Sequence, residues 1–158
     1  MNRARYEQLQ QQYGYKPSPA SGDRPFVGVR IDGDVVYVSG NVAFSGGELL
    51  YKGRIGDTVS IEDGKKSAAL AMLNCLAAID AEIGLEQVDK FLKVTGFVCC
   101  AEHVTEQPQI MNAASQVLVD VFGEAGKHAR SALGIHTLPL GASVEIELIL
   151  KRKPEASR

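Results

Sequence analysis

The feature that most constrains the fold is an apolar pattern of helical period between Ile61 and Gly84. Apolar side chains recur there at intervals of three and four residues, so a helix would carry them on one side. Such a helix needs a sheet or another helix on which to bury that side. Gly84 is well suited to end it. The apolar stripe consists of Ala69, Met72, Leu73, Leu76, Ile79 and Ile83.

Strand-like segments lie on both sides of this helix. Residues 26–44 contain two β-branched runs around Asp32-Gly33, a dipeptide that favours a short hairpin. A short strand is also expected near Leu49. Residues 88–103 are apolar enough for a strand in the middle of a sheet.

A second helix is predicted after Pro108, which suits a first helical turn, and Gly123 suits its end. Two final strands follow it. The element order is therefore ββ(β)αβαββ, which predicts an α+β fold with a mixed, mostly antiparallel sheet and two helices on one face. Two helices leave the other face of such a sheet uncovered, and an uncovered apolar face favours a homo-oligomer.

The chain has 158 residues, of which 45% are hydrophobic and 23% charged, as in an ordinary single globular domain. Residues 1–23 are expected to form a helical arm and a proline-rich linker, because three prolines break the pattern after Tyr15. The domain proper is expected over residues 24–153, with a tail over 154–158. We expect the arm to pack on the outer surface and to extend the rim of a cleft.

Several classes of function are disfavoured. The net charge is −2 and no basic tract occurs, so nucleic-acid binding is not expected. The apolar runs are too short to span a membrane, and residues 1–15 lack the apolar core of a secretion signal, which favours a cytoplasmic setting. Three cysteines (Cys75, Cys99 and Cys100) and three histidines lack metal-ligand spacing, so we expect buried structural thiols and no metal or cofactor.

Arg130 is a charged residue in a strand-like run whose neighbours are small. Period-two alternation puts Ala132 and Gly134 on its face, which would leave a hollow above the sheet. A guanidinium there could bind a carboxylate through two parallel hydrogen bonds. The alternative is a solvated edge arginine or one paired with an internal glutamate, and the pattern alone favours that alternative.

Glu145 is the nearest candidate partner for Arg130 within the last two strands. If these strands form a hairpin centred near Leu140, Arg130 lies opposite Leu150, and Glu145 is roughly 16 Å away. The two side chains could then meet only across a subunit interface.

Two further polar residues have a plain and a functional interpretation. Ser39, before Gly40, is more commonly a strand-ending turn serine, but its hydroxyl could line a pocket. No hydrolase triad can be assigned around it. His128 shares the face of Arg130 and could transfer protons, although a surface histidine is the more common case.

Three segments together resemble the YjgF/RidA family. They are "HARSALGIHTLPLGASVEIELIL", with an Arg-Ser pair, a Leu-Pro step and Val-Glu-Ile-Glu; "VVYVSGNVAF", with its Ser-Gly; and "LKVTGFVCCAEH". The resemblance extends from Arg24 to about Arg152, and the N-terminal arm is similar to that of a long-form sub-branch. It implies a chorismate-mutase-like fold and a homotrimer with clefts between subunits.

The resemblance also implies an activity, the hydrolysis of 2-imino and enamine acids such as 2-aminoacrylate to 2-keto acids and ammonia without a cofactor. Arg130 matches the family's carboxylate-binding arginine, and Ser39 and Glu145 match its pocket serine and glutamate. Backbone groups near Gly40 and Ala132 would hold the attacking water.

This chain departs from the family's pattern at two positions. Phe26 replaces the tyrosine of the archetype, and Ala132 replaces a frequent cysteine. Both changes make the predicted pocket more apolar. Two alternatives to a deaminase remain, a non-catalytic trimeric protein that binds a small carboxylate in the same cleft and, least favoured, a ribonuclease.

Overall fold

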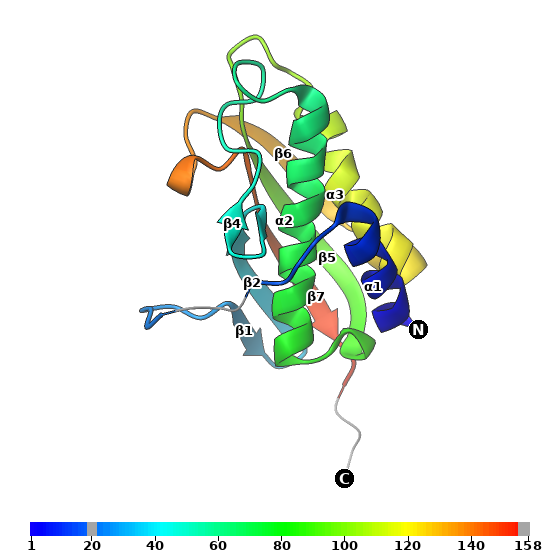
Figure 1. The fold of residues 1–158 in the computed structure, drawn as a ribbon. Helices are drawn as coiled ribbons and strands as arrows, with labels where there is room; N and C mark the ends of the chain where they lie inside the picture. Colours follow the sequence, from blue (N-terminus) through cyan, green and yellow to red (C-terminus); the bar gives the residue numbers. More distant parts are fainter. Residues whose placement is uncertain (19–21, 155–158) are drawn as a thin grey trace.

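The computed structural model describes residues 1–18 and 22–154, and its centre is a five-stranded sheet in the order β1-β2-β7-β5-β6 (Figure 1). All pairs are antiparallel except β5 and β6, which run parallel. The predicted mixed, mostly antiparallel sheet is confirmed. Its strands are β1 (Val29–Asp32), β2 (Val35–Asn41), β5 (Val88–Cys99), β6 (Ala129–Ile135) and β7 (Val144–Arg152). A separate small hairpin joins β3 (Phe44–Ser45) to β4 (Glu48–Leu49).

Two long helices cover one face of the sheet, as expected (Figure 1). They are α2 (Ile61–Glu82) and α3 (Gln107–Phe122). The Ser60 hydroxyl caps α2 by accepting the backbone N–H of Asp63 at 3.1 Å. Short 3₁₀ turns lie at Leu85–Gln87, Gly123–Gly126 and Pro139–Gly141.

The N-terminal helix α1 (Asn2–Tyr13) adds an outer layer against α2 and α3 (Figure 1). Tyr6 and Leu9 are buried in the same core as the sheet. The Tyr6 hydroxyl donates to the Leu73 carbonyl at 3.1 Å, and the Tyr15 hydroxyl lies 2.7 Å from Asn74 Oδ1. The arm is thus part of the folded core, on the outer side of the helices where it was expected.

The last two strands do not form the predicted hairpin. Strand β5 lies between them, with β6 on one side and β7 on the other. The reason is that α3 connects β5 to β6 as a crossover, and a crossover brings the next strand back parallel to the first. Arg130 is consequently paired with Val94 of β5, not with Leu150.

The other face of the sheet carries no helix among the described residues, and we call it the open face. Strand pairing puts Leu133, Phe97 and Glu145 in one row on it, and Tyr37 lies in another. Tyr37 and Leu133 are each 47% exposed, which is unusual for large apolar side chains in the middle of strands. An uncovered face of this kind is what the count of helices predicted.

The expectation that the cysteines are buried is also met. Cys75, Cys99 and Cys100 are all buried and unpaired, as structural thiols. None of the helices in the described ranges has both the length and the apolar character needed to cross a membrane.

Candidate functional site

Arg130 lies on edge strand β6 and faces the helices. Its strand partner Val94 and the next residue across, Leu148, are both buried beneath the helices, and paired residues share a face. Its hydrogen-bond partners in the described chain belong to helix α3: Nη1 donates to Asn112 Oδ1 (2.9 Å) and Ser115 Oγ (3.1 Å), and Nη2 to the Pro108 carbonyl (3.3 Å). Arg130 therefore points toward α3, away from the open face.

The hollow predicted above the small residues of β6 is filled by the protein itself. A Cβ on Gly134 would lie 2.7 Å from Gln107 Nε2, and a Cβ on its neighbour across the sheet, Gly96, would meet the Met111 side chain. The small residues are needed because α3 packs closely over the sheet. Ala132, between Arg130 and Gly134 on this face, is partly buried against the core. Side chains of α3 therefore occupy the space that the pattern of small residues predicted to be open.

His128 precedes β6 and is half-buried, not a surface residue as the pattern favoured. Its Nδ1 lies 2.7 Å from the Gly126 carbonyl and its Nε2 lies 3.0 Å from Ser115 Oγ. Burial lowers the pKa of His128 below its ordinary value of 6.5, and the nearby positive charge of Arg130 adds to this effect. His128 and Arg130 thus share Ser115 as a common hydrogen-bond partner.

Ser39 and Phe26 lie together near the other edge of the sheet. Ser39 is within β2, which continues to Asn41 and does not end at Ser39-Gly40 as expected. Its hydroxyl donates to the Val27 carbonyl at 2.7 Å, and this bond ties down the loop that carries Phe26. Phe26 is 55% exposed, with the Arg24 guanidinium 4.9 Å from its ring centre. The hydroxyl of Ser39 is thus used structurally, although its oxygen can still accept a hydrogen bond.

Glu145 lies on the open face, directly over Gly40. A Cβ on Gly40 would lie 2.9 Å from Glu145 Oε1, so only glycine leaves room for this carboxylate. Glu145 has no hydrogen bond or ion pair within residues 1–18 and 22–154. Burial raises the pKa of Glu145 above its ordinary value, and the neighbouring carboxylate of Glu147 raises it further. Glu145 therefore accepts a proton more readily, and keeps it to higher pH, than an ordinary surface glutamate.

The predicted site residues fall into two groups that do not meet within one chain. Ser39, Gly40 and Glu145 are on or beside the open face, whereas Arg130 and Ala132 face the helices. Strand β2 is also three strands from β6, which is roughly 14 Å at the usual strand spacing. A small molecule bound to Arg130 cannot reach Ser39 of the same chain.

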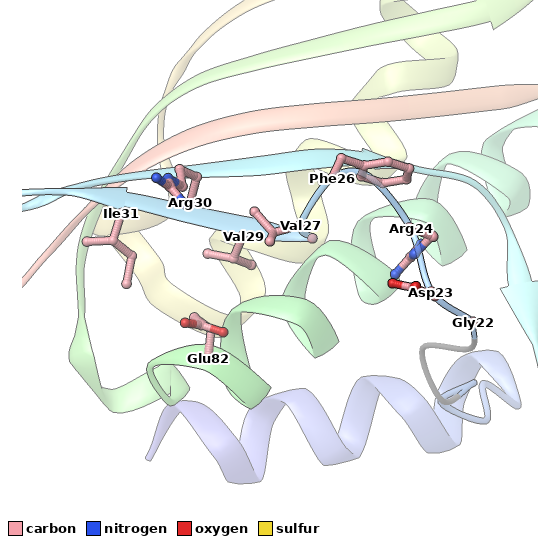
Figure 2. Close-up of a pocket in the computed structure, with 10 residues that line it drawn as sticks. Gly22, Asp23, Arg24, Phe26, Val27, Val29, Arg30, Ile31 and Glu82 are labelled. Atoms are coloured by element: carbon pink, nitrogen blue, oxygen red, sulfur yellow. The ribbon is translucent and has the colours of Figure 1, made fainter.

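The largest pocket described, about 600 Å³, lies beside β1 at the edge opposite Arg130. Figure 2 shows Val29 and Ile31 pointing from β1 toward Glu82 at the end of α2, while Arg24 and Asp23 border the other side. A smaller pocket of about 220 Å³ lies on the open face and includes Ser39. Neither includes Arg130.

No metal centre is assembled by the residues of the described ranges, because no three His, Cys, Asp or Glu side chains gather there as ligands would. Burial raises the pKa of the Cys75 thiol to about 12, which keeps it protonated and unreactive.

This fold, with the half-buried Arg130 on its edge strand β6, defines a class of protein, the α+β proteins of the chorismate-mutase-like type. A family model described as "YjgF/chorismate_mutase-like, putative endoribonuclease" matches residues 18–150. The chain belongs to this family.

Relatives of similar length support this assignment. "Protein TCP17" of Trypanosoma cruzi is 31% identical over 144 residues, which are 89% of this chain and 90% of that protein. The crystal structure of Atu1372, a protein of unknown function from Agrobacterium tumefaciens, shares 31% identity with a TM-score of 0.86 and covers 96% of this chain and 91% of its own. A Shewanella oneidensis protein described as a putative endoribonuclease shares 26% identity, with a TM-score of 0.84, over 92% of this chain and 98% of its own.

Sequence reasoning missed Asn112 and Ser115, the two α3 side chains that bind Arg130. They are three residues apart, so they share one side of a helix, next to the apolar stripe that packs on the sheet. That spacing was a usable signal for a polar pair at the edge of the core. It could not indicate the partner, because nothing local in the sequence places Arg130 beside α3.

Proposed function

We propose that this protein hydrolyses 2-imino and enamine acids to 2-keto acids and ammonia, with Arg130 as the anchor for the substrate carboxylate. The observation that carries the proposal is the burial of Arg130 and the kind of hydrogen-bond partners that it has. It is half-buried and held by three acceptors of α3, yet it has no carboxylate partner within the described chain. A guanidinium has five N–H donors, so two remain for a ligand. Two donors are what a bidentate carboxylate requires.

A homotrimer would complete this site. Ser39, Gly40, Phe26 and Glu145 of a second copy would face Arg130 across the subunit interface. The exposed Phe26, Tyr37 and Leu133 support such an assembly, because they leave large apolar surface uncovered in one chain. TdcF of Escherichia coli, which shares this fold, has a structure with bound serine, itself a small carboxylate-bearing molecule (TM-score 0.56, 19% identity, over 89% of this chain and 95% of that one).

The reaction requires little machinery. An enamine first becomes the imine by taking a proton at its β-carbon and losing one from nitrogen. Water then adds to the imine carbon to give a carbinolamine. The nitrogen takes up a proton, the hydroxyl gives one up as the carbonyl forms, and the C–N bond breaks to release ammonia and the keto acid. Imines hydrolyse without a catalyst, so orientation of substrate and water, with help in proton transfer, is a sufficient contribution. Backbone groups near Ala132 and Gly40 would hold the water. The raised pKa of Glu145 makes it a stronger base than an ordinary glutamate, which suits a group that assists proton transfer.

The test generates imino acids in place with an amino-acid oxidase and follows their disappearance spectroscopically. The wild-type protein should accelerate the loss, and Arg130→Ala should abolish the acceleration. Arg130→Lys should retain little activity, because an ammonium cannot form the bidentate contact. Arg5→Ala is the matched control, since Arg5 also donates to a backbone carbonyl of α3, that of Val121, but lies on α1.

Equal rates with wild-type protein and Arg130→Ala would contradict the deaminase proposal. Binding of pyruvate to the wild-type protein, lost in Arg130→Ala and not accompanied by any acceleration, would instead favour a binding protein that uses the same anchor.

A further inference from the structure

When His128 is neutral, the hydrogen bonds that connect Gly126, His128, Ser115 and Arg130 have one consistent direction. The Gly126 carbonyl can only accept, so His128 Nδ1 carries a proton and donates to it. In neutral His128 the other nitrogen, Nε2, is then an acceptor, and it receives the hydroxyl proton of Ser115. The Ser115 oxygen in turn accepts from Arg130 Nη1.

We propose that His128 and Ser115 are positioning residues that fix the Arg130 guanidinium for carboxylate binding. This inference rests on the proposed role of Arg130 as the anchor. Ser115 holds one Nη1 hydrogen and Asn112 holds the other, at 3.1 and 2.9 Å. With the Pro108 carbonyl on Nη2, the plane of the guanidinium is set from three points on α3. The two remaining donors are thereby held in fixed positions before a ligand arrives.

His128 is needed because a serine hydroxyl in the middle of a helix has another partner within reach. Such a hydroxyl commonly donates to the carbonyl one turn earlier, which here is that of Met111. An acceptor at Nε2, 3.0 Å away, directs the hydroxyl toward His128 and leaves its oxygen lone pairs facing Arg130. Without that acceptor, Ser115 can rotate, and Arg130 loses one of its three fixed points.

The charge state of His128 is suited to this role. Burial, and to a smaller extent the positive charge of Arg130, lower the pKa of His128 and favour the neutral imidazole, and together they outweigh the hydrogen bond to the Gly126 carbonyl, which raises that pKa. No carboxylate forms a salt bridge with either residue in the described chain. A neutral, oriented histidine supports the guanidinium without adding a charge that would compete for the substrate.

The experiment compares three variants in the imino-acid assay, His128→Phe, His128→Gln and Ser115→Ala. His128→Phe and Ser115→Ala should raise KM roughly tenfold with kcat nearly unchanged, because they weaken the carboxylate contact equally in the ground state and the transition state. His128→Gln retains a side-chain acceptor and should restore KM to within a few-fold of wild type. Ser115→Ala improves helix propensity and should fold even if His128→Phe does not. His103→Phe, on an exposed loop, is the matched control.

The energetic coupling between His128 and Arg130 is measured by introducing His128→Phe into the Arg130→Ala variant as well as into the wild-type protein. The binding of pyruvate, measured by calorimetry, is the readout there and in the single variants. His128→Phe should weaken pyruvate binding in the wild-type background and have no further effect once Arg130 is gone.

The outcomes separate this inference from the proposed function. If Arg130→Ala is inactive but Ser115→Ala and His128→Phe keep the wild-type KM and pyruvate affinity, the positioning role is wrong and the deaminase proposal stands. If the wild-type protein binds pyruvate without hydrolysing imines, the deaminase proposal fails. The positioning role then stands if Ser115→Ala and His128→Phe bind pyruvate more weakly than the wild-type protein, and it fails if they bind equally well. If the wild-type protein neither hydrolyses imino acids nor binds pyruvate, both the deaminase proposal and the positioning role are overturned.

Discussion

Arg130 owes its orientation to uncharged groups. Two side chains and one carbonyl of α3 hold it, and no carboxylate does so within the described residues. Neutral acceptors leave the full positive charge available, whereas an internal ion pair would oppose a substrate carboxylate. A half-buried guanidinium without a counter-ion is unfavourable for stability alone, so this arrangement favours a ligand-binding role.

The carboxyl group of Glu145 should make the stability of the folded chain depend on pH. Its pKa is raised in the folded chain above the ordinary value of 4.5, so the folded state binds a proton more readily than the unfolded state. Stability should therefore fall as pH rises from about 4.5 through the raised pKa. Glu145→Gln cannot ionise and should be more stable than wild type at neutral pH, with the difference vanishing below about pH 4.

Urea unfolding at several pH values measures this effect, and Glu102→Gln, an exposed loop carboxylate, is the control. A wild-type stability that rises with pH relative to Glu145→Gln would contradict this prediction, which is made for the single chain, and would instead fit the proposed assembly, in which Arg130 of a second copy faces Glu145.

At the scale of elements, the crossover helix α3 determines where Arg130 lies. It returns the chain parallel to β5, which makes β6 an edge strand, and it then packs over the small residues of that strand. The same helix supports α1 on its outer side. Helix α1 has 12 residues, too few to be stable alone in water, so its docking depends on Tyr6 and Leu9.

Leu9→Ala should release α1 from the helix layer. Truncating a buried leucine typically destabilises by about 2–5 kcal/mol, which exceeds what an isolated short helix can supply. Amide hydrogen exchange should become fast over residues 2–13 while α2 and α3 remain protected. Glu7→Ala, exposed on the same helix, should leave exchange unchanged. Unchanged protection of α1 in Leu9→Ala would show that Tyr6 and Tyr15 suffice to hold it.

In the whole molecule, α2 and α3 cover one face of the sheet and α1 lies outside them, whereas no α-helix of the described residues covers the other face. The open face exposes Tyr37 and Leu133, and Phe26 is exposed beside its β1 edge. The two groups of predicted site residues lie on different faces and strands, so only an assembly of several copies could unite them. One association of chains would thus cover apolar surface and complete the site.

Leu133→Asp should dissociate the proposed homotrimer, because a carboxylate in an apolar interface loses its hydration without a partner. Light scattering should give three times 17.0 kDa for wild type and about 17.0 kDa for the variant. Gln8→Asp, exposed on α1, should keep the wild-type mass. A wild-type mass for Leu133→Asp would exclude this part of the open face from the interface.

Much of the fold was predictable because it depends on local patterns. The period of 3.6 located α2 and α3, Asp32-Gly33 located the first hairpin, and the run after residue 88 predicted an interior strand. The placement of Arg130, Ala132 and Gly134 on one face followed from the alternation of a strand.

The neighbours of Arg130 were decided by tertiary structure alone. Which strand lies beside β6, and which face α3 covers, depend on contacts between residues far apart in the chain, and no local period reports them. A wrong hairpin placed Arg130 opposite Leu150, whereas the crossover pairs it with Val94. The alternation of residues in the sequence was enough to place the charged side chain of Arg130 among small residues. Its partners Asn112 and Ser115, and His128 through Ser115, became neighbours only through the packing of α3 on β6.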